Sequence, residues 1–447
     1  MKRETLSFPS AVSVVISSMI GVGVFTSLGF QLAAMPSAFP ILLLWVLGGA
    51  VSLCGALCYA ELVAMWPRSG GEYHLLREAY HPLVGFLAGW VSLTAGFAAP
   101  LAALGIAFGV YGHDLGVPVS PGVLAAGVVL LLAALHLGPL RLVGGFLTAA
   151  TGLKVALILA FLVGALAAPG GETIALAPRA GDGALLVSAP FAVSMVYVLF
   201  AYSGWNGAAY VASEVRDPQR MVPRALLWGT SIVTVLYVAL NAVFLSRAPW
   251  ERMSGQVEVA LIAGSALFGP RGGGWVGWMV MLGLLSTIAS YTWAGSRVTD
   301  RIGQDYPRLG ALARRNRWGA PHIALALQTA LAMGMLASGK FEAVVNYLMV
   351  LLQVSSLLAV VAVIVWRRRA PDAPRPFRVP LYPLPPLIFI AATAWVLAFQ
   401  VLDRPWESAG GLLTLAVGWA LYRWAGAYPV TGARSSLARH RSLDGRH

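Results

Sequence analysis

The sequence predicts an all-α integral membrane protein with twelve spanning helices, first of all from its composition. Of the 447 residues, 58% are hydrophobic and only 11% are charged, whereas soluble proteins carry roughly 25% charged residues. The apolar residues also form long blocks separated by short polar segments. A hydrocarbon core about 30 Å thick requires about 20 apolar residues in a helix, and a helix satisfies its own backbone polar groups inside lipid.

Twelve apolar blocks are long enough to span a bilayer. We expect the spans at 11–33, 39–65, 82–110, 120–137, 142–168, 188–212, 223–246, 274–297, 321–338, 342–366, 381–402 and 408–426. The region from Trp250 to Gly274 is too polar for a span and should form an outer loop with a short helix. Residues 1–10 and the basic tail 427–447 are expected to flank the membrane domain.

The placement of the basic residues predicts the orientation of the chain. With the N-terminus inside, 24 of the 31 Lys and Arg fall on the cytoplasmic side, six lie outside and Lys154 lies within a span. This asymmetry is the positive-inside signal, so both termini are expected in the cytoplasm of a multi-pass cell-membrane protein. A net charge of +13 could also indicate nucleic-acid binding, but the lipid bilayer explains the distribution better and no nucleic acid is expected.

Two helices are interrupted at matching positions. The first is broken by Gly21-Val22-Gly23, and the sixth by the segment Ser203 to Gly207. Glycine costs about 1 kcal/mol in a helix interior, and paired interruptions mark transporter binding sites. Helices 1–5 (11–168) and 6–10 (188–366) would then form a five-plus-five inverted repeat, with peripheral helices at 381–426. Close helix packing is the alternative explanation for Gly21 and Gly23.

The unwound backbone at the breaks predicts a site for a zwitterion. The outer half of helix 1 begins with free N–H groups at Val22, Gly23 and Val24, which suit a carboxylate. An ammonium group would need acceptors, for which we expect the freed carbonyls of Met19, Ile20, Phe200 and Ala201. No acidic residue lies within either break, which favours a neutral amino acid over a cationic one.

Side chains of helix 6 complete the expected pocket. Phe200 and Tyr202 can line or cover it, although packing in a membrane core is an equally good explanation of two aromatic residues. Ser203 places a small hydroxyl where a substrate side chain can point, and Asn206 offers both donors and acceptors. Small or medium neutral side chains are therefore favoured.

Lys154 lies twelve residues into helix 5, about 18 Å from its start at 1.5 Å per residue. An ionised lysine at mid-bilayer costs about 2.5–3.5 kcal/mol on insertion scales, so it needs a polar partner. We expect its ammonium to bridge carbonyls of helix 1 to hydroxyls of helix 8, Thr287 or Ser290. It would then occupy the space of a sodium ion. A purely structural lysine and a proton-coupling site are the alternatives.

Glu61 lies near the cytoplasmic end of helix 2 and is expected to be an interfacial anchor paired with a loop arginine, for which Arg68 is the candidate. No His-Glu-x-x-His motif, no intramembrane cluster of His or Asp, and no phosphate-binding Gly-Lys loop occurs in the sequence. We therefore expect no enzyme, no metal and no cofactor. A channel is disfavoured because no charge ring or filter repeat is evident.

Several motifs together resemble the amino acid–polyamine–organocation superfamily of permeases, over helices 1 to 10. They are Ile20 to Phe25 in helix 1, the loop Pro67-Arg68-Ser69-Gly70-Gly71-Glu72-Tyr73, and Phe200 to Asn206 in helix 6. Within the superfamily, the chain is most similar to the neutral amino-acid exchangers related to the L-type transporters. Val22 departs from the serine common in the helix 1 motif, so its contact would be through the backbone alone.

The resemblance implies a LeuT-like fold with alternating access and with Phe200 as the aromatic gate. It also implies that Lys154 replaces sodium, as in sodium-independent members. L-type transporters pair with a heavy chain through an extracellular cysteine, but none lies between helices 3 and 4 here, so no disulfide-linked partner is expected. Exchange, proton symport through Lys154, and a transport-deficient amino-acid sensor remain open.

Overall fold

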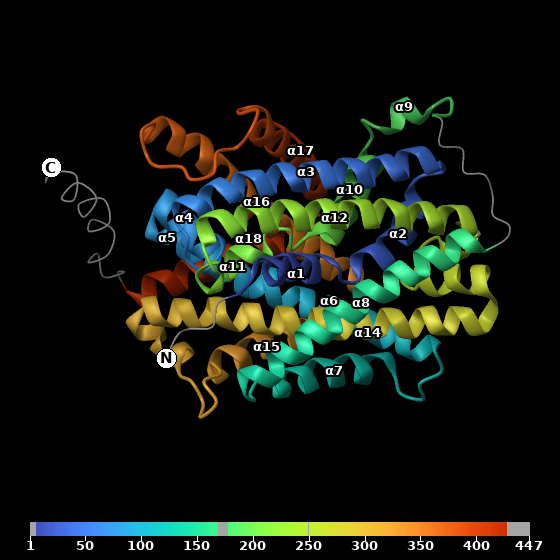
Figure 1. Cartoon of the computed structure of the whole chain (residues 1–447), viewed down its shortest axis with the longest axis horizontal. Helices are drawn as coiled ribbons and strands as arrows, with labels where there is room; N and C mark the ends of the chain where they lie inside the picture. Colours follow the sequence, from blue (N-terminus) through green and yellow to red (C-terminus); the bar gives the residue numbers. More distant parts are fainter. Residues whose placement is uncertain (1–5, 169–177, 249, 339, 427–447) are drawn as a thin grey trace, which may run out of the picture.

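The computed structural model describes residues 6–168, 178–248, 250–338 and 340–426. Within these residues the chain is helical, and its extended structure is limited to one isolated bridge between Leu6 and Val215. The expected tail 427–447 lies outside the described residues. Several consecutive helices are joined by only a few residues, as α6 is to α7 and α17 to α18, and lie side by side (Figure 1).

Helical structure occupies each of the first five expected spans. The bounds are α1 (Phe8–Met19), α2 (Gly23–Ala34), α3 (Ala38–Met65), α4 (Glu72–Ala79), α5 (Pro82–Val91), a π-helix (Ser92–Ala98), α6 (Ala99–Asp114), α7 (Pro121–Leu135) and α8 (Leu140–Ala167). Span 1 is thus divided into α1 and α2, and α4 is a short helix in the connection after span 2. The seven-residue π-helix within span 3 was not foreseen from the sequence, and such segments often occur at functional sites.

The second half repeats this pattern of one divided and four long helical segments. Its bounds are α9 (Asp182–Leu185), α10 (Ala189–Tyr202), α11 (Gly207–Tyr210), a 3₁₀ turn (Ala212–Glu214), α12 (Pro218–Arg247), α13 (Trp250–Met253), α14 (Val259–Asp305), a 3₁₀ segment (Pro307–Ala313), α15 (His322–Leu336) and α16 (Phe341–Arg369). Two further helices follow, α17 (Leu384–Asp403) and α18 (Pro405–Ala425).

The segment from Trp250 to Gly274 is more helical than expected. It contains α13 and the beginning of α14, which bends at Gly269, where φ is 72° and ψ is 179°. Pro270 follows this bend, and a proline lacks the N–H that would continue the helix. The outer loop predicted from polarity is therefore two short helical pieces, because the apolar run before Gly269 can pack one face on the protein.

Eight helical stretches within the described residues are long and apolar enough to cross a membrane, judged by length and composition. They are Phe8–Ala34, Ala38–Met65, Pro82–Asp114, Ala149–Ala167, Pro218–Arg247, Val259–Asp305, Phe341–Arg369 and Leu384–Asp403. Three shorter apolar helices, Pro121–Leu135, Ala189–Tyr202 and His322–Leu336, also coincide with expected spans.

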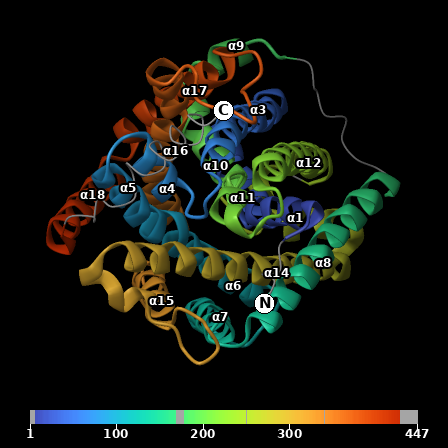
Figure 2. The ribbon, with the colours of Figure 1, turned by 60° about the vertical axis from the view of Figure 1, so that its left-hand side comes forward.

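The two interrupted helices lie in the middle of the bundle. Figure 2 shows α1 and α11 enclosed by α3, α12, α14 and α16, whereas α18 lies at the edge. α1 packs on α12 and on α11, and α2 packs on α10. Each half of one broken helix therefore lies beside a half of the other.

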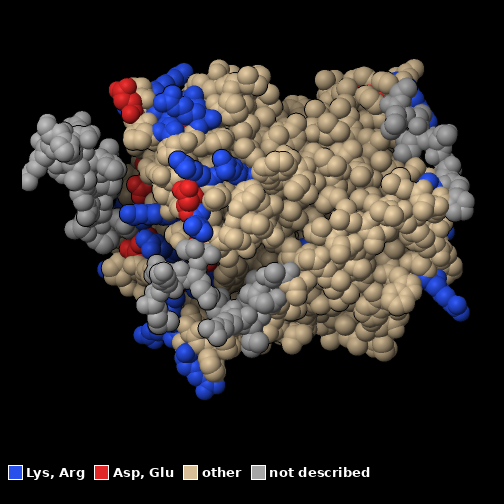
Figure 3. All heavy atoms as spheres, viewed as in Figure 1, with Lys and Arg blue, Asp and Glu red and all other residues tan. Residues whose placement is uncertain are grey.

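Charged side chains gather at one end of the molecule. Figure 3 shows most of the visible Lys and Arg at the left, the end at which Figure 1 places α4 and α5, with few at the opposite end. The arginine-rich loops around 297–317 and 367–378 account for much of this charge. We call this the basic end. Few charged side chains are visible over the middle of this face, as lipid contact requires.

Candidate binding site at the two helix breaks

The break in helix 1 exposes the beginning of α2. α1 ends at Met19, Ile20 leaves the helix with ψ of 83°, and α2 begins at Gly23. The N-cap Val22 makes no side-chain capping bond, and the N–H groups of Val22, Gly23 and Val24 donate to no described residue. The start of a helix leaves such donors without intrahelical partners, so three N–H groups are available to an anion here.

The break in helix 6 depends on glycine. Gly204 has φ of +97°, a conformation that side chains disfavour, and a Cβ at this position would lie 2.5 Å from the carbonyl oxygen of Ser18. α10 ends at Tyr202 and α11 begins at Gly207, so the chain runs non-helically between them. Glycine is therefore needed both for the backbone turn and for the close approach to α1.

The two breaks are in direct contact. A Cβ built on Gly23 would lie 2.4 Å from the Cα of Ala201, so packing and unwinding both explain the glycines of helix 1. The hydroxyl of Tyr237 in α12 donates to the carbonyls of Met19 at 2.6 Å and of Ala201 at 3.1 Å. Tyr237 thus joins the two breaks. The sequence carried no signal for this role, because a tyrosine in an apolar helix is equally typical of core packing.

Lys154 of α8 reaches the break between α1 and α2 and the helix α14 with its ammonium. The Nζ atom donates to the carbonyl of Ile20 at 2.6 Å and to Oγ1 of Thr287 at 2.9 Å, and lies 3.5 Å from the carbonyl of Ser17. Thr287 also donates to Ile20 at 3.0 Å. Ser290, the alternative partner in α14, makes no hydrogen bond to Lys154 and instead lines a cavity.

The carbonyls expected to accept a substrate ammonium already accept protein donors. The oxygen of Met19 accepts from Tyr237 and from Gly21 N–H, and that of Ile20 accepts from Lys154 and Thr287. A hydroxyl has a single proton, so Tyr237 shares its proton between Met19 and Ala201, and Thr287 shares its own between Ile20 and the Gly283 carbonyl at 3.2 Å. The Phe200 oxygen accepts from Ser203 N–H, and the Ala201 oxygen accepts from Tyr237, which leaves one lone pair on each.

Two cavities meet at the breaks. A small one of about 20 Å³ is lined by Met19, Gly21, Val22, Gly23, Phe200, Ala201 and Thr287, among others. A larger one of about 430 Å³ extends along α1 to Pro9, and this volume is typical of small-molecule sites. Ser18, Ser203 and Tyr291 line both. An amino acid therefore fits the larger cavity, while the smaller one holds about one water-sized group.

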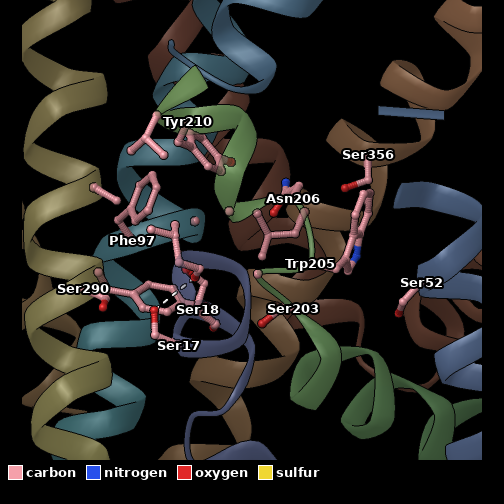
Figure 4. Close-up of a pocket in the computed structure, with 18 of the residues that line it drawn as sticks. Ser17, Ser18, Ser52, Phe97, Ser203, Trp205, Asn206, Tyr210, Ser290 and Ser356 are labelled. Atoms are coloured by element: carbon pink, nitrogen blue, oxygen red, sulfur yellow. Dashed lines mark hydrogen bonds between the residues drawn. The ribbon is translucent and has the colours of Figure 1, made fainter. Parts of the chain in front are cut away.

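The larger cavity lies on both sides of the α10–α11 connection. Figure 4 shows Ser17, Ser18, Phe97 and Ser290 on one side and Ser52 and Ser356 on the other, with Ser203 and Asn206 between them. Phe97 belongs to the π-helix, so that segment contributes to the cavity wall. Three of the expected site residues line neither cavity: Ile20, Val24 and Tyr202. The Tyr202 hydroxyl donates instead to the carbonyl of Trp45 at 2.9 Å.

Aromatic residues close the opposite side of the breaks. Phe200 packs edge-on against Phe341 with ring centroids 6.0 Å apart, and Phe30 stacks on Phe341 at 6.1 Å and on Tyr197 at 4.9 Å. Tyr197 also donates to Glu342 at 2.9 Å. The large cavity extends towards the basic end, where it reaches Glu72 of α4, whereas the aromatic cluster includes Phe30 of α2, beyond the helix 1 break.

α4 brings several polar groups to the inner part of the bundle. Glu72 accepts from Tyr59 at 2.8 Å, from Asn206 Nδ2 at 2.5 Å and from the Tyr210 hydroxyl. On the same helix, the Tyr73 hydroxyl donates to Asp305 at 2.6 Å. The motif around Gly71 and Glu72 was visible in the sequence, but its contacts with helix 6 were not, because they join residues more than a hundred positions apart.

Glu61 is an anchor, but Arg68 is not its partner. The Glu61 carboxylate pairs with Arg367 at 2.5 Å and with Arg375 at 3.4 Å, and accepts from Val379 N–H at 2.7 Å. These partners come from the end of α16 and the loop after it. Sequence proximity favoured Arg68, whereas the fold brings the more distant loop across the end of α3.

A bundle of apolar helices, with two central helices interrupted face to face over a cavity, defines the class of helical membrane transporters. The comparison with known families names the particular group. The profile described as amino acid permease matches residues 6–419, so this chain belongs to the amino acid permease family, within the amino acid–polyamine–organocation superfamily. Membership supports amino-acid transport as the general activity of a multi-pass membrane protein.

Several proteins named as amino-acid transporters or exchangers align with this chain over most of their length. The serine/threonine exchanger SteT of Bacillus subtilis (strain 168) is 27% identical, covering 94% of this chain and 96% of the relative. The b(0,+)-type amino acid transporter 1 of Mus musculus is 26% identical, with 94% and 87% covered. The Asc-type amino acid transporter 1 of Mus musculus is 28% identical, with 94% and 80% covered.

Proposed function

We propose that the protein is a sodium-independent secondary transporter of neutral L-amino acids that works by alternating access as an exchanger. The observation that carries this proposal is the ammonium of Lys154, which donates to Ile20 and Thr287 beside the helix 1 break. Unwound carbonyls at such breaks coordinate sodium in sodium-driven transporters. A covalently attached cation supplies that charge permanently, so no sodium ion is needed to complete the site.

The substrate class follows from the charges at the breaks. The N–H groups of Val22, Gly23 and Val24 suit the α-carboxylate, and neither break carries an acidic side chain for a second ammonium. Ser203, on the wall shared by the two cavities, is the residue towards which the substrate side chain would point. These features favour small or medium neutral amino acids.

We also propose a five-plus-five inverted repeat of the LeuT-like type with twelve spans. Residues 11–168 and 188–366 would form the two repeats, 381–426 would be peripheral, and both termini would be cytoplasmic. In that orientation the large cavity faces the cytoplasm and the cluster around Phe341 closes the outside. Both cysteines, Cys54 and Cys58, lie within α3, so no disulfide-linked heavy chain is proposed.

The deciding experiment is uptake of labelled neutral amino acids into proteoliposomes without sodium. Vesicles would be prepared with and without the same amino acid inside, at equal and at unequal pH. Uptake that requires internal substrate supports exchange. Uptake in the absence of sodium that equals uptake in its presence supports the role of Lys154 as the fixed cation, and strict sodium dependence contradicts it.

Proton symport is the second candidate, because Lys154 is buried among neutral oxygen atoms and could exchange a proton. Uptake into empty vesicles driven by an inward proton gradient would favour it. A transport-deficient amino-acid sensor is the third candidate. Binding without flux under every condition would favour that reading over both forms of transport.

A further inference from the structure

Glu72 is a buried acid held by neutral groups from three parts of the chain. Its side chain receives hydrogen bonds from Tyr59 in α3, from Asn206 at the helix 6 break and from Tyr210 in α11. The residue is 3% exposed and lines the large cavity. It forms no ion pair with any described residue, and no other residue lining this cavity carries a formal charge.

The carboxylate determines which way the Asn206 amide faces. An ionised carboxylate can only accept hydrogen bonds, so the atom of Asn206 that lies 2.5 Å away must be the nitrogen. The oxygen, Oδ1, then points away from Glu72. It accepts no hydrogen bond from any described residue and is not among the buried unpaired atoms. Because Asn206 lines the large cavity, this oxygen is an acceptor open to the cavity (Figure 4).

An open acceptor matters here because the backbone acceptors on the helix 1 side of the site already receive protein donors, whereas only one lone pair each is left at Phe200 and Ala201. Two protein donors approach each of the oxygens of Met19 and Ile20, so an incoming ammonium would compete with a protein donor at either. The Asn206 oxygen requires no displacement. The negative charge of Glu72 on the far side of the amide also polarises it in the direction that strengthens acceptance of a cationic donor.

We propose that Glu72 is a positioning residue of the substrate site, which fixes the Asn206 amide with its oxygen towards the cavity and so creates an acceptor for the α-ammonium of an amino acid. This inference rests on the proposed function, since it assigns a group that recognises the amino-acid substrate. It also gives a physical reason for glutamate at this position. A glutamine can donate to Asn206 Oδ1, which lets the amide turn and present its nitrogen to the cavity.

The test compares two ligands that differ only in the group recognised. Binding of L-alanine and of L-lactate, which has a hydroxyl in place of the ammonium, is measured by displacement of labelled L-alanine from the purified protein. The pair L-serine and glycerate, or L-leucine and its 2-hydroxy acid, replaces L-alanine and L-lactate if that amino acid binds more tightly. We expect the preference for the amino acid to fall roughly tenfold in Glu72→Gln, since a charge-assisted hydrogen bond is lost.

Two variants separate positioning from support of the fold. Tyr59→Phe removes a different donor from Glu72 and leaves the Asn206 contact intact, so it should keep the wild-type preference. Asn206→Ala removes the acceptor itself and should lose the preference as Glu72→Gln does, which keeps the test decisive if the glutamine variant fails to fold.

An unchanged preference in Glu72→Gln or Asn206→Ala overturns the inference while leaving the proposed function in place. If the affinities for L-alanine and L-lactate fall equally in both Glu72→Gln and Tyr59→Phe, the inference is also overturned, because a purely structural role gives that result. A wild-type protein that binds none of the amino acids overturns the proposed function and the inference with it.

Discussion

The Nζ atom of Lys154 lies 2.6 Å from the carbonyl oxygen of Ile20, so a cation carried by α8 lies at the break between α1 and α2. Thr287 completes a triangle with both groups, at 2.9 Å from Lys154 and 3.0 Å from Ile20. One side chain therefore joins three elements of the bundle at the point where backbone hydrogen bonds are missing.

Replacing Lys154 by alanine should lower amino-acid uptake at least about tenfold, because each charged hydrogen bond lost at the break contributes about 1.5–3 kcal/mol. The protein should still elute as a single species in size-exclusion chromatography. Leu153→Ala changes the neighbouring residue, which is 48% exposed on the outside of α8, and serves as the control. Wild-type uptake in Lys154→Ala would remove this residue from the mechanism.

Gly23→Ala should destabilise the protein by about 1–3 kcal/mol, the cost of overpacking a close contact. Its Cβ would lie 2.4 Å from the Cα of Ala201, which is backbone and cannot turn aside. Gly152→Ala in α8 is the matched control, since nothing lies within 4 Å of its added Cβ. The midpoint of thermal unfolding in detergent measures both, and equal midpoints would show that α2 and α10 can separate at little cost.

Glu61→Gln should destabilise the fold by about 3–5 kcal/mol, because it leaves the buried charge of Arg375 without its counter-ion. Asp217→Asn removes a carboxylate from an exposed pair 4.0 Å from Arg220, which is worth less than about 1 kcal/mol. Thermal unfolding of the two variants side by side checks the contrast. A small effect of Glu61→Gln would mean that the loop after α16 is held by its backbone hydrogen bonds instead.

Burial lowers the pKa of His74 in α4 to about 3, with a further contribution from nearby arginines. The unfolded-state pKa of about 6.5 is higher, so the unfolded chain binds more protons between these values. The stability that neutral His74 provides is complete above pH 6.5 and is lost as the pH falls towards 3, by up to about 1.4 kcal/mol per pH unit.

His74→Gln should therefore lose less thermal stability than the wild type between about pH 7.5 and about pH 5. Unfolding midpoints measured at several pH values, with the other titrating groups common to both proteins, isolate this difference. Parallel pH profiles would contradict the expected role of His74.

The positions of the two breaks could be predicted from the sequence because glycine clusters, Gly21 with Gly23 and Gly204 with Gly207, fall at matching positions of two expected helices. Lys154 could be placed for a related reason, since its cost in lipid demands partners. The long helices followed from apolar length alone. These predictions depend only on residues close together in the chain, so a single sequence is enough to make them.

The contacts that shape the cavity could not be predicted in the same way. Tyr237 bridges Met19 and Ala201, and Glu72 holds Asn206, across large separations in sequence. Spacing carries no information about such pairs, and a tyrosine or asparagine in an apolar helix fits many roles. The partner of Glu61 was misassigned for this reason, because proximity along the chain favours Arg68 over Arg367.

The bridge between Leu6 and Val215 ties the start of α1 to the segment after α11. Leu6 N–H donates to the Glu214 carbonyl at 2.7 Å, and Arg216 N–H donates back to Leu6 at 3.0 Å. These bonds join α1 and α11, one arm of each broken helix, at the edge of the large cavity. Deleting residues 1–7 would remove these hydrogen bonds and, of the residues that line the cavity, only Leu6. The transport rate of this variant would show whether α1 and α11 must move together.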